Sequence, residues 1–312
     1  MAHAFVGTAE LLQLADGNIS DIDVSELLED APMLAILAAI EATNETSHEW
    51  LKKTAAPSAG FRSLNDGRGN TKAVYTKVTQ ALKLFDASFD LDIGLLKTSS
   101  GDKLMRREAV DHLKTAFASM EKQLFYGVGN DAGGFAGFTA EDAVKFKNSA
   151  MVVDATGSSA NATTSVWAIR TGESAVSAVY GGGGRIELSD AYPAMRAGST
   201  TGNYDVMRTP ILFWGGCQVA TSLDLARICN LAAATGKGLT DELLADLIAK
   251  FPAGRGPTHL VMNRQSHKQL QQSRTATNAT GAPAPFPTEA YGVPIVVTDQ
   301  ISNTEAVVAA AP

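Results

Sequence analysis

Cysteines, long apolar runs and basic residues are scarce in this sequence of 312 residues, and each scarcity excludes a class of protein. Two cysteines, Cys217 and Cys229, are too few for a disulfide-stabilised scaffold, and their apolar neighbours indicate buried thiols. The most apolar stretch, residues 31–40, has about half the length needed to cross a bilayer. A net charge of −7 argues against binding nucleic acid through a broad basic face. We therefore expect a soluble protein made in a reducing cytoplasm, without a membrane partner.

The net charge is divided unevenly along the chain. Residues 1–50 contain no lysine or arginine and carry −10, residues 51–83 carry +6, and the remainder carries −3. The acidic segment includes Asp21, Asp23, Glu26, Glu29 and Asp30. The basic segment includes Lys52, Lys53, Arg62, Arg68 and Lys72. An acidic arm is thus followed directly by a basic one.

The first ninety residues predict extended elements without a core of their own. Pro32 suits the first turn of a short helix within an otherwise irregular arm. Proline, glycine, asparagine and aspartate are dense at 54–71 and predict a long exposed turn, after which apolar and polar residues alternate as in a strand. We interpret 48–92 as a two-stranded excursion with a flexible tip. Such a hairpin is unstable alone, so we expect it to lie on another surface.

The rest of the chain predicts an α+β protein. Apolar residues at intervals of three and four predict a long helix over 101–126, which the glycines from Gly127 onward end. Strand patterns follow over 165–230. A helix capped by Thr240, a short strand, a helix capped by Asn263 and a final buried strand complete the chain.

No motif predicts a catalytic, cofactor or metal site. Gly127, Gly129 and Ala132 match the spacing of a dinucleotide fingerprint, but a helix precedes them where a strand is needed, so we interpret them as a helix-ending turn. Ser100 and Lys103 match a serine hydrolase pair without its partner motifs, and a serine before a helix is more often a cap. The histidines lack metal-site spacing.

The order of these elements resembles the major capsid proteins of tailed bacteriophages with the Hong Kong 97-like fold, of the type without a fused scaffolding domain. The residues that carry the likeness are EKQLFYGVGN, GGFAGF, SVWAIRTGESAVSAVYGGGG, LDLARICNL, HLVMNRQSHKQL and YGVPIVVTDQISNTE. The resemblance covers nearly the whole chain and depends on the order of these strings more than on any one of them.

The resemblance implies four structural parts. Residues 1–47 would form an N-arm and 48–95 an E-loop. Residues 96–239 would form a peripheral (P) domain, with a spine helix at 101–127 and an antiparallel sheet of long strands at 165–230. Residues 240–312 would form the core of an axial (A) domain and the C-terminus. In the prototype of the fold the long P-domain strands follow the A-domain, whereas here similar strands precede it.

The resemblance also implies a function. Copies would self-assemble into pentamers and hexamers of an icosahedral shell that encloses double-stranded DNA without binding it specifically. A separate scaffolding protein, a portal protein and a possible decoration protein would be partners. The shell would be assembled in the bacterial host cytoplasm and become part of the virion.

Particular residues would serve in these contacts. The charged residues of the two opposite segments would join copies: Lys52, Lys53, Arg62, Arg68 and Lys72 on one side, and Asp21, Asp23, Glu26, Glu29 and Asp30 on the other. The loop 275–289, with Asn278, Pro283 and Phe286, would lie near the symmetry axes.

Three alternatives remain open at this point. An encapsulin-like compartment shares the fold but encloses a protein cargo. A two-domain soluble enzyme could draw a catalytic set from distant positions. The two charged segments could also be an ordinary solvated loop beside an acidic tail.

Overall fold

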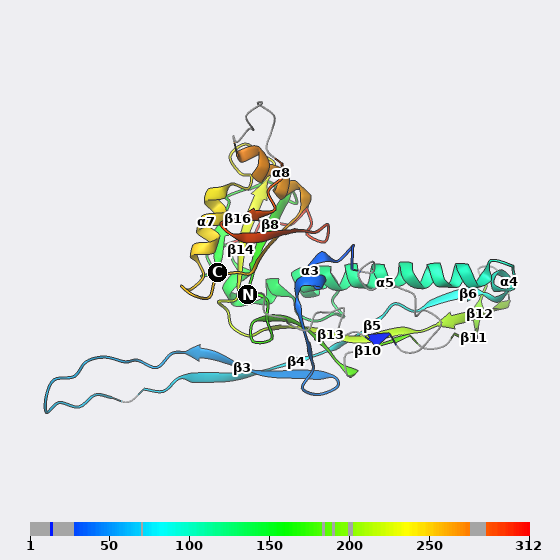
Figure 1. The fold of residues 1–312 in the computed structure, drawn as a ribbon, viewed down its shortest axis with the longest axis horizontal. Helices are drawn as coiled ribbons and strands as arrows, with labels where there is room; N and C mark the ends of the chain where they lie inside the picture. The colour runs from blue at the N-terminus through cyan, green and yellow to red at the C-terminus, as the bar shows by residue number, and fades with distance from the viewer. Residues whose placement is uncertain are drawn as a thin grey trace.

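The computed structural model describes residues 13–14, 28–69, 71–182, 185–188, 191–198, 202–274 and 285–312. It is an α+β protein, as predicted, with two lobes and a projecting hairpin (Figure 1). The helices and 3₁₀ turns are α3 (Pro32–Ile36), α4 (Ile93–Leu96), α5 (Gly101–Tyr126), η1 (Gly127–Gly129), η2 (Phe138–Ala140), α6 (Asp142–Lys145), α7 (Asp241–Ala249) and α8 (Arg264–Ser273).

The strands fall into sheets that belong to one lobe or the other, apart from the hairpin. They are β1 (Gln13–Leu14), β2 (Ala38–Glu41), β3 (Ser47–Ala55), β4 (Val74–Ala81), β5 (Lys83–Asp86), β6 (Phe89–Asp92), β7 (Val152–Asp154), β8 (Thr163–Ile169), β9 (Val176–Tyr180), β10 (Arg185–Leu188), β11 (Tyr192–Ala197), β12 (Asn203–Thr209), β13 (Ile211–Val219), β14 (Leu225–Ala232), β15 (His259–Met262), β16 (Glu289–Ala290) and β17 (Val293–Val297).

Helix α5 is the main support of the first lobe, which we call the α5 lobe. It spans the predicted residues, and at 1.5 Å per residue it is about 40 Å long. Its buried stripe includes Ala109, Leu113, Phe117, Met120 and Leu124. Below it in Figure 1 lies a sheet of order β1–β10–β13–β9–β2 with β5 on β13, and a smaller sheet β11–β12–β6 lies toward its N-terminal end.

The helix ends at Gly127, as predicted. The φ of this residue is +53°, and a Cβ there would lie 2.3 Å from the backbone nitrogen of Gly137. Only glycine fits such an approach.

The second lobe, which we call the α7/α8 lobe, holds a mixed sheet of order β16–β17–β15–β8–β14–β7 with α7 and α8 packed on it (Figure 1). The strand patterns over 165–230 therefore divide between two lobes: β8 and β14 lie here, whereas β9 and β13 lie in the α5 lobe. Every residue of β8 and β14 is buried. Such strands need neighbours on both sides and cover on both faces, which β15, β7 and the helices provide.

The chain therefore does not pass from one lobe to the other once, at residue 240, as the predicted domain boundary implies. It enters the α7/α8 lobe at β7, leaves it after β8 for the α5 lobe, and returns at β14.

A buried polar cluster joins the lobes. The Glu305 carboxylate accepts hydrogen bonds from Arg227 of β14 (2.9 Å), Ser165 of β8 (2.5 Å) and Tyr126 at the end of α5 (2.6 Å). Burial, followed by the nearby Glu305 charge, raises the pKa of the Tyr126 hydroxyl. The phenol therefore remains a hydrogen-bond donor to the carboxylate.

Both cysteines lie inside the protein. Cys217 and Cys229 are buried, as predicted, and burial raises the pKa of both thiols. Among the described residues, no helix combines the length and the apolar character that a membrane span requires.

Candidate assembly surface

The β3–β4 hairpin projects from the body as a two-stranded ribbon (Figure 1). Its strands pair in an antiparallel register from Ser47↔Ala81 to Ala55↔Val74. The hairpin begins close to the predicted position but ends earlier, because residues 83–92 form β5 and β6 within the sheets of the α5 lobe. The buried side chain of Leu82 marks the point where the chain enters the body.

His48 fastens the base of the hairpin to the α5 lobe. Its Nδ1 accepts a hydrogen bond from the Thr43 backbone N–H (3.2 Å), so its Nε2 carries the proton and donates to Gln218 Oε1 of β13 (2.6 Å). The ring also stacks on Trp50, with centroids 5.6 Å apart. The buried His48 therefore sets where the ribbon leaves the body.

Lys52 lies on the same face of the ribbon as His48 and forms a second attachment. Its Nζ is 2.6 Å from Glu141 Oε2, and about a fifth of the lysine side chain is exposed. On the opposite, outward face the Glu49–Lys77 pair is more exposed, and the hydrogen bond from Lys77 lowers the pKa of Glu49. Lys52, predicted as a contact between copies, thus has a partner within its own chain.

The other basic candidates on the hairpin, Lys53, Arg62, Arg68 and Lys72, are exposed. Arg62 donates to the backbone oxygen of Asp66 (2.9 Å), and Arg68 donates to that of Gly60 (2.9 Å). These bonds shape the tip and still leave both guanidinium groups at the surface. The four residues can therefore meet another molecule.

The tip also exposes large apolar side chains. Phe61 is fully exposed and Leu64 is 95% exposed. Farther down the ribbon Leu51 and Tyr75 are also exposed. Isolated exposed apolar residues are ordinary, but a cluster on a projecting element is typical of an interaction surface.

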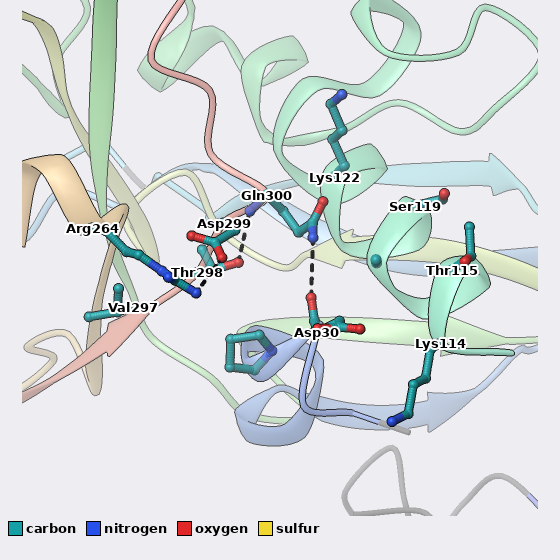
Figure 2. A pocket seen from close by; sticks show the side chains of 12 residues that line it. Asp30, Lys114, Thr115, Ser119, Lys122, Arg264, Val297, Thr298, Asp299 and Gln300 are labelled. Carbon is teal, nitrogen blue, oxygen red and sulfur yellow. Dashed lines mark hydrogen bonds and ion pairs between the residues drawn. The ribbon is translucent and has the colours of Figure 1, made fainter. Parts of the chain in front are cut away.

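The acidic candidates are described only in part. Asp21, Asp23 and Glu26 lie outside the described residues, whereas Glu29 and Asp30 are exposed. Asp30 lines a cleft of about 410 Å³ between α3, α5 and the segment after β17. Figure 2 shows the side chains that line it. The backbone oxygen of Asp30 accepts a hydrogen bond from Gln300 (3.2 Å).

Basic and acidic side chains line the same cleft. Lys114 and Lys122 of α5 line one wall, and Arg264, paired to Asp299 at 2.6 Å, lines another (Figure 2). Asp30 of the acidic segment therefore lies at a surface with an excess of basic groups.

The remaining candidates belong to the predicted axial loop. Asn278 and Pro283 lie outside the described residues. Phe286 is 57% exposed, and its ring centroid lies 5.0 Å from that of His267 on α8. His267 Nε2 donates to the backbone oxygen of Pro287 (2.8 Å), which holds this end of the loop on the α7/α8 lobe.

Some important contacts were not predicted from the sequence. His48 and Gln218 are 170 positions apart, and Lys52 and Glu141 are 89 apart. Nearby residues in the sequence do not indicate either contact. The exposure of Phe61 and Leu64 could have been predicted, because apolar residues within a turn rich in glycine and polar residues have no core to enter. In the part of the chain that the structure describes, no cluster of histidine, cysteine and carboxylate side chains could hold a metal.

Comparison with known proteins agrees with the resemblance. The family model described as "Major capsid protein GP7" matches residues 15–309. A chain from the structure of bacteriophage Epsilon15 is similar with 16% identity and a TM-score of 0.66, over 95% of this chain and 91% of that one. A chain of the bacteriophage JBD30 capsid is similar with 13% identity and a TM-score of 0.50, over 92% of this chain and 96% of that one. No curated protein matches.

Proposed function

The chain belongs to the major capsid protein GP7 family, and we propose that its β3–β4 hairpin and acidic N-terminal segment hold neighbouring copies together. The protein is a shell protein of a bacteriophage capsid with the Hong Kong 97-like fold, and as such it self-associates and is part of the virion. Its role is structural.

The observation that carries the proposal is the hairpin itself. A two-stranded ribbon is at best marginally stable in water, and none of the described residues of the same chain cover the outer half of this one. A shell supplies the missing surface, because each copy lies beside others. The +6 segment and the −10 segment then offer complementary charges at every contact.

In this proposal the parts of the molecule have separate tasks. Residues 1–47 are the N-arm, and the hairpin is the E-loop. The α5 lobe is the P-domain, and the α7/α8 lobe is the A-domain, with the 275–289 loop near the symmetry axes. In this proposal the A-domain contains β7 and β8 as well as residues 225–312, and it is therefore larger than the domain 240–312 predicted from the sequence.

The proposal extends to the whole particle. Pentamers and hexamers form an icosahedral shell around double-stranded DNA. A separate scaffolding protein, a portal protein and a possible decoration protein take part, and assembly occurs in the bacterial host cytoplasm. The acidic net charge suits a container, since a lining that bound phosphates tightly would hinder packing and release of DNA.

Charge reversal on the exposed half of the hairpin tests the proposal. Lys53, Arg62 and Arg68 are changed together to glutamate in the full chain, and particles are counted by electron microscopy. We expect a soluble subunit that assembles poorly. A matched control reverses Lys97, Lys250 and Lys268, which are exposed and outside the hairpin, and should assemble normally.

Two results would contradict the proposal. Normal particle yield from the hairpin variant would show that these charges of the hairpin do not contribute to the contacts between copies. Particles from phage-producing cells that held a protein cargo in place of DNA would favour the compartment alternative.

A further inference from the structure

The turn at the tip of the hairpin contains the dipeptide Asp66–Gly67. The sequence has one other aspartate followed by glycine, Asp16–Gly17, which lies outside the described residues. Asp66 and Gly67 are both exposed. A glycine after an aspartate leaves its backbone nitrogen open to the side-chain carboxyl group, because it has no Cβ to stand in the way. The dipeptide is therefore a candidate for a spontaneous rearrangement of the backbone.

The carboxyl group of Asp66 lies against the nitrogen with which it would react. The Gly67 N–H donates to Asp66 Oδ1 over 2.8 Å. A Cβ on Gly67 would meet no atom within 4 Å, so the approach to this nitrogen is open. Attack of this nitrogen on the carboxyl carbon of the preceding residue closes a succinimide ring.

Arg62 contacts the carbonyl group of the peptide bond that would rearrange. Its Nη1 donates to the backbone oxygen of Asp66 (2.9 Å). A positively charged donor draws electron density from that carbonyl group and from the amide bond between Asp66 and Gly67. The Gly67 nitrogen then gives up its proton more easily, and the Asp66 carbonyl carbon becomes a better target for water.

We propose that Asp66–Gly67 forms a succinimide spontaneously and that Arg62 directs the opening of the ring toward isoaspartate. In the first step the Gly67 nitrogen bonds to Asp66 Cγ, the Cγ–OH bond breaks, and the hydroxyl leaves with the proton of the nitrogen as one water molecule. In the second step water adds to the Asp66 backbone carbonyl carbon, and the bond from this carbon to the Gly67 nitrogen breaks. Water is the only co-reactant. The inference goes beyond the proposed function and does not depend on it.

The product has a longer backbone at the tip. The chain runs through Asp66 Cβ and Cγ, and the former backbone carbonyl group becomes a free carboxylate. The Arg62 guanidinium already contacts an oxygen of that group, so the product gains an ion pair at this point. One basic group of the tip thereby acquires a local anionic partner.

Asp131 provides a comparison within the same chain. It is also exposed and lies in a glycine-rich loop, but the residue after it is Ala132. Its Oδ1 accepts from the N–H of Gly133, two positions on, over 2.8 Å. The nitrogen in contact is therefore not the one that closes a succinimide. We expect Asp131 to remain unchanged while Asp66 rearranges.

Incubation of the full-length chain in water enriched in heavy oxygen tests the proposal. Each ring opening places one solvent oxygen in the product, whether the product is aspartate or isoaspartate. Mass spectrometry of peptides locates the label, and chromatography separates the two forms of the Asp66 peptide. We expect label in both forms, with isoaspartate in excess, and no label in the Asp131 peptide. An unlabelled Asp66 peptide, over a period in which a synthetic peptide of residues 60–70 gains label, would overturn the inference.

Gly67→Ala tests the chemistry without disturbing the turn. The φ of Gly67 lies outside the left-handed region and a Cβ there meets no atom, so alanine fits this backbone. Its methyl group hinders the nitrogen, and the label at Asp66 should be lost. Equal label in Gly67→Ala and wild type would overturn the succinimide route.

Arg62→Ala tests the direction of ring opening. The ratio of labelled isoaspartate to labelled aspartate at Asp66 should fall, because water then loses its preference for the backbone carbonyl carbon. Arg68→Ala is the matched control, since Arg68 is exposed at the same tip but donates to the backbone oxygen of Gly60 (2.9 Å). It should leave the ratio unchanged. Equal ratios in wild type and Arg62→Ala would overturn the role of Arg62.

Discussion

The Lys52 ammonium group lies 2.6 Å from the Glu141 carboxylate, and this ion pair joins the projecting hairpin to the body just after α5 and its glycine-rich loop. Both side chains are mostly shielded from solvent, so the pair is less screened than one on an open surface. Together with His48 and Gln218 it gives the ribbon two attachments on one face. The direction of the hairpin is thus set within the subunit, before any neighbour is present.

Reversing Lys52 should release the ribbon without unfolding the lobes. Lys52→Glu places two carboxylates together, and we expect faster hydrogen exchange in β3 and β4 and fewer assembled particles. Lys53→Glu is the control, because this neighbouring lysine is exposed on the other face and should leave exchange unchanged. The exchange Lys52→Glu with Glu141→Lys should restore both properties. Normal exchange in Lys52→Glu would show that the pair does not hold the ribbon.

Glu121 joins three segments that are far apart in the sequence. It lies on α5 and is fully buried, and its Oε2 accepts from the backbone N–H groups of Met33 (2.9 Å) and Leu34 (3.4 Å) at the start of α3. The Thr298 hydroxyl donates to its other oxygen. Burial outweighs these hydrogen bonds and raises the pKa of Glu121 to about 7.

This raised pKa predicts a pH dependence of stability. Between the ordinary value of 4.5 and about 7, the folded chain keeps a proton that the unfolded chain has released. The contribution of this group to stability therefore falls as pH rises through that window, by roughly 3 kcal/mol in all, and is constant above it. Glu121→Gln removes the titration and keeps the shape. Relative to wild type, the variant should gain most of that amount between pH 5 and pH 8.

Denaturant unfolding of unassembled subunits at several pH values measures this difference. Glu29→Gln, at an exposed carboxylate, should show the same profile as wild type. Parallel profiles for wild type and Glu121→Gln would contradict the prediction.

The buried Arg227–Glu305 pair predicts a large single-site effect. The side chains are 5% and 6% exposed, and the Arg227 guanidinium also lies 5.0 Å from the Trp167 ring. Glu305→Ala leaves this cation without its partner and should lower the free energy of unfolding by roughly 3–5 kcal/mol. Replacing both by apolar residues, Arg227→Met with Glu305→Leu, should cost less, since no buried charge is left unpaired; the remaining cost comes from the Ser165 and Tyr126 hydroxyls, which lose their acceptor. Chemical denaturation measures the free energy of unfolding of the wild type and of each variant.

An exposed pair of similar length is the control for that experiment. Arg264 and Asp299 are 2.6 Å apart but 79% and 59% exposed, so Arg264→Ala should cost about 0–1 kcal/mol. Similar losses for the two pairs would mean that burial is not what makes the Glu305 site sensitive.

Local signals account for the parts of the fold that could be predicted. The α5 period, the Thr240 and Asn263 caps and the turn at 54–71 each depend on residues a few positions apart. The caps form as expected, with Thr240 accepting from Leu243 N–H and Asn263 from Ser266 N–H. The capsid resemblance, which the family match supports, likewise came from the order of such local strings.

The division into lobes could not be predicted in this way. Strands β8 and β9 both consist of buried residues, and nothing within either strand indicates that β8 joins β14 while β9 joins β13. The partner of Lys52 was missed for the same reason. Packing between segments that are distant in the sequence decides which strands pair. Local patterns in a single sequence do not indicate this pairing.

The glycine-rich loop after α5 allows a sharp test, because two glycines of the same motif have opposite surroundings. Gly127 has a φ of +53°, and a Cβ there would lie 2.3 Å from the Gly137 nitrogen; a Cβ at Gly129 would meet no atom within 4 Å. Gly127→Ala must therefore strain the backbone and push apart two segments in contact. We expect it to lower the midpoint of thermal unfolding and to cost at least about 2 kcal/mol. Gly129→Ala should change stability by less than about 0.5 kcal/mol. Equal losses of stability in the two variants would contradict this prediction. They would show that the close approach of Gly127 to Gly137 does not determine the cost of the substitution.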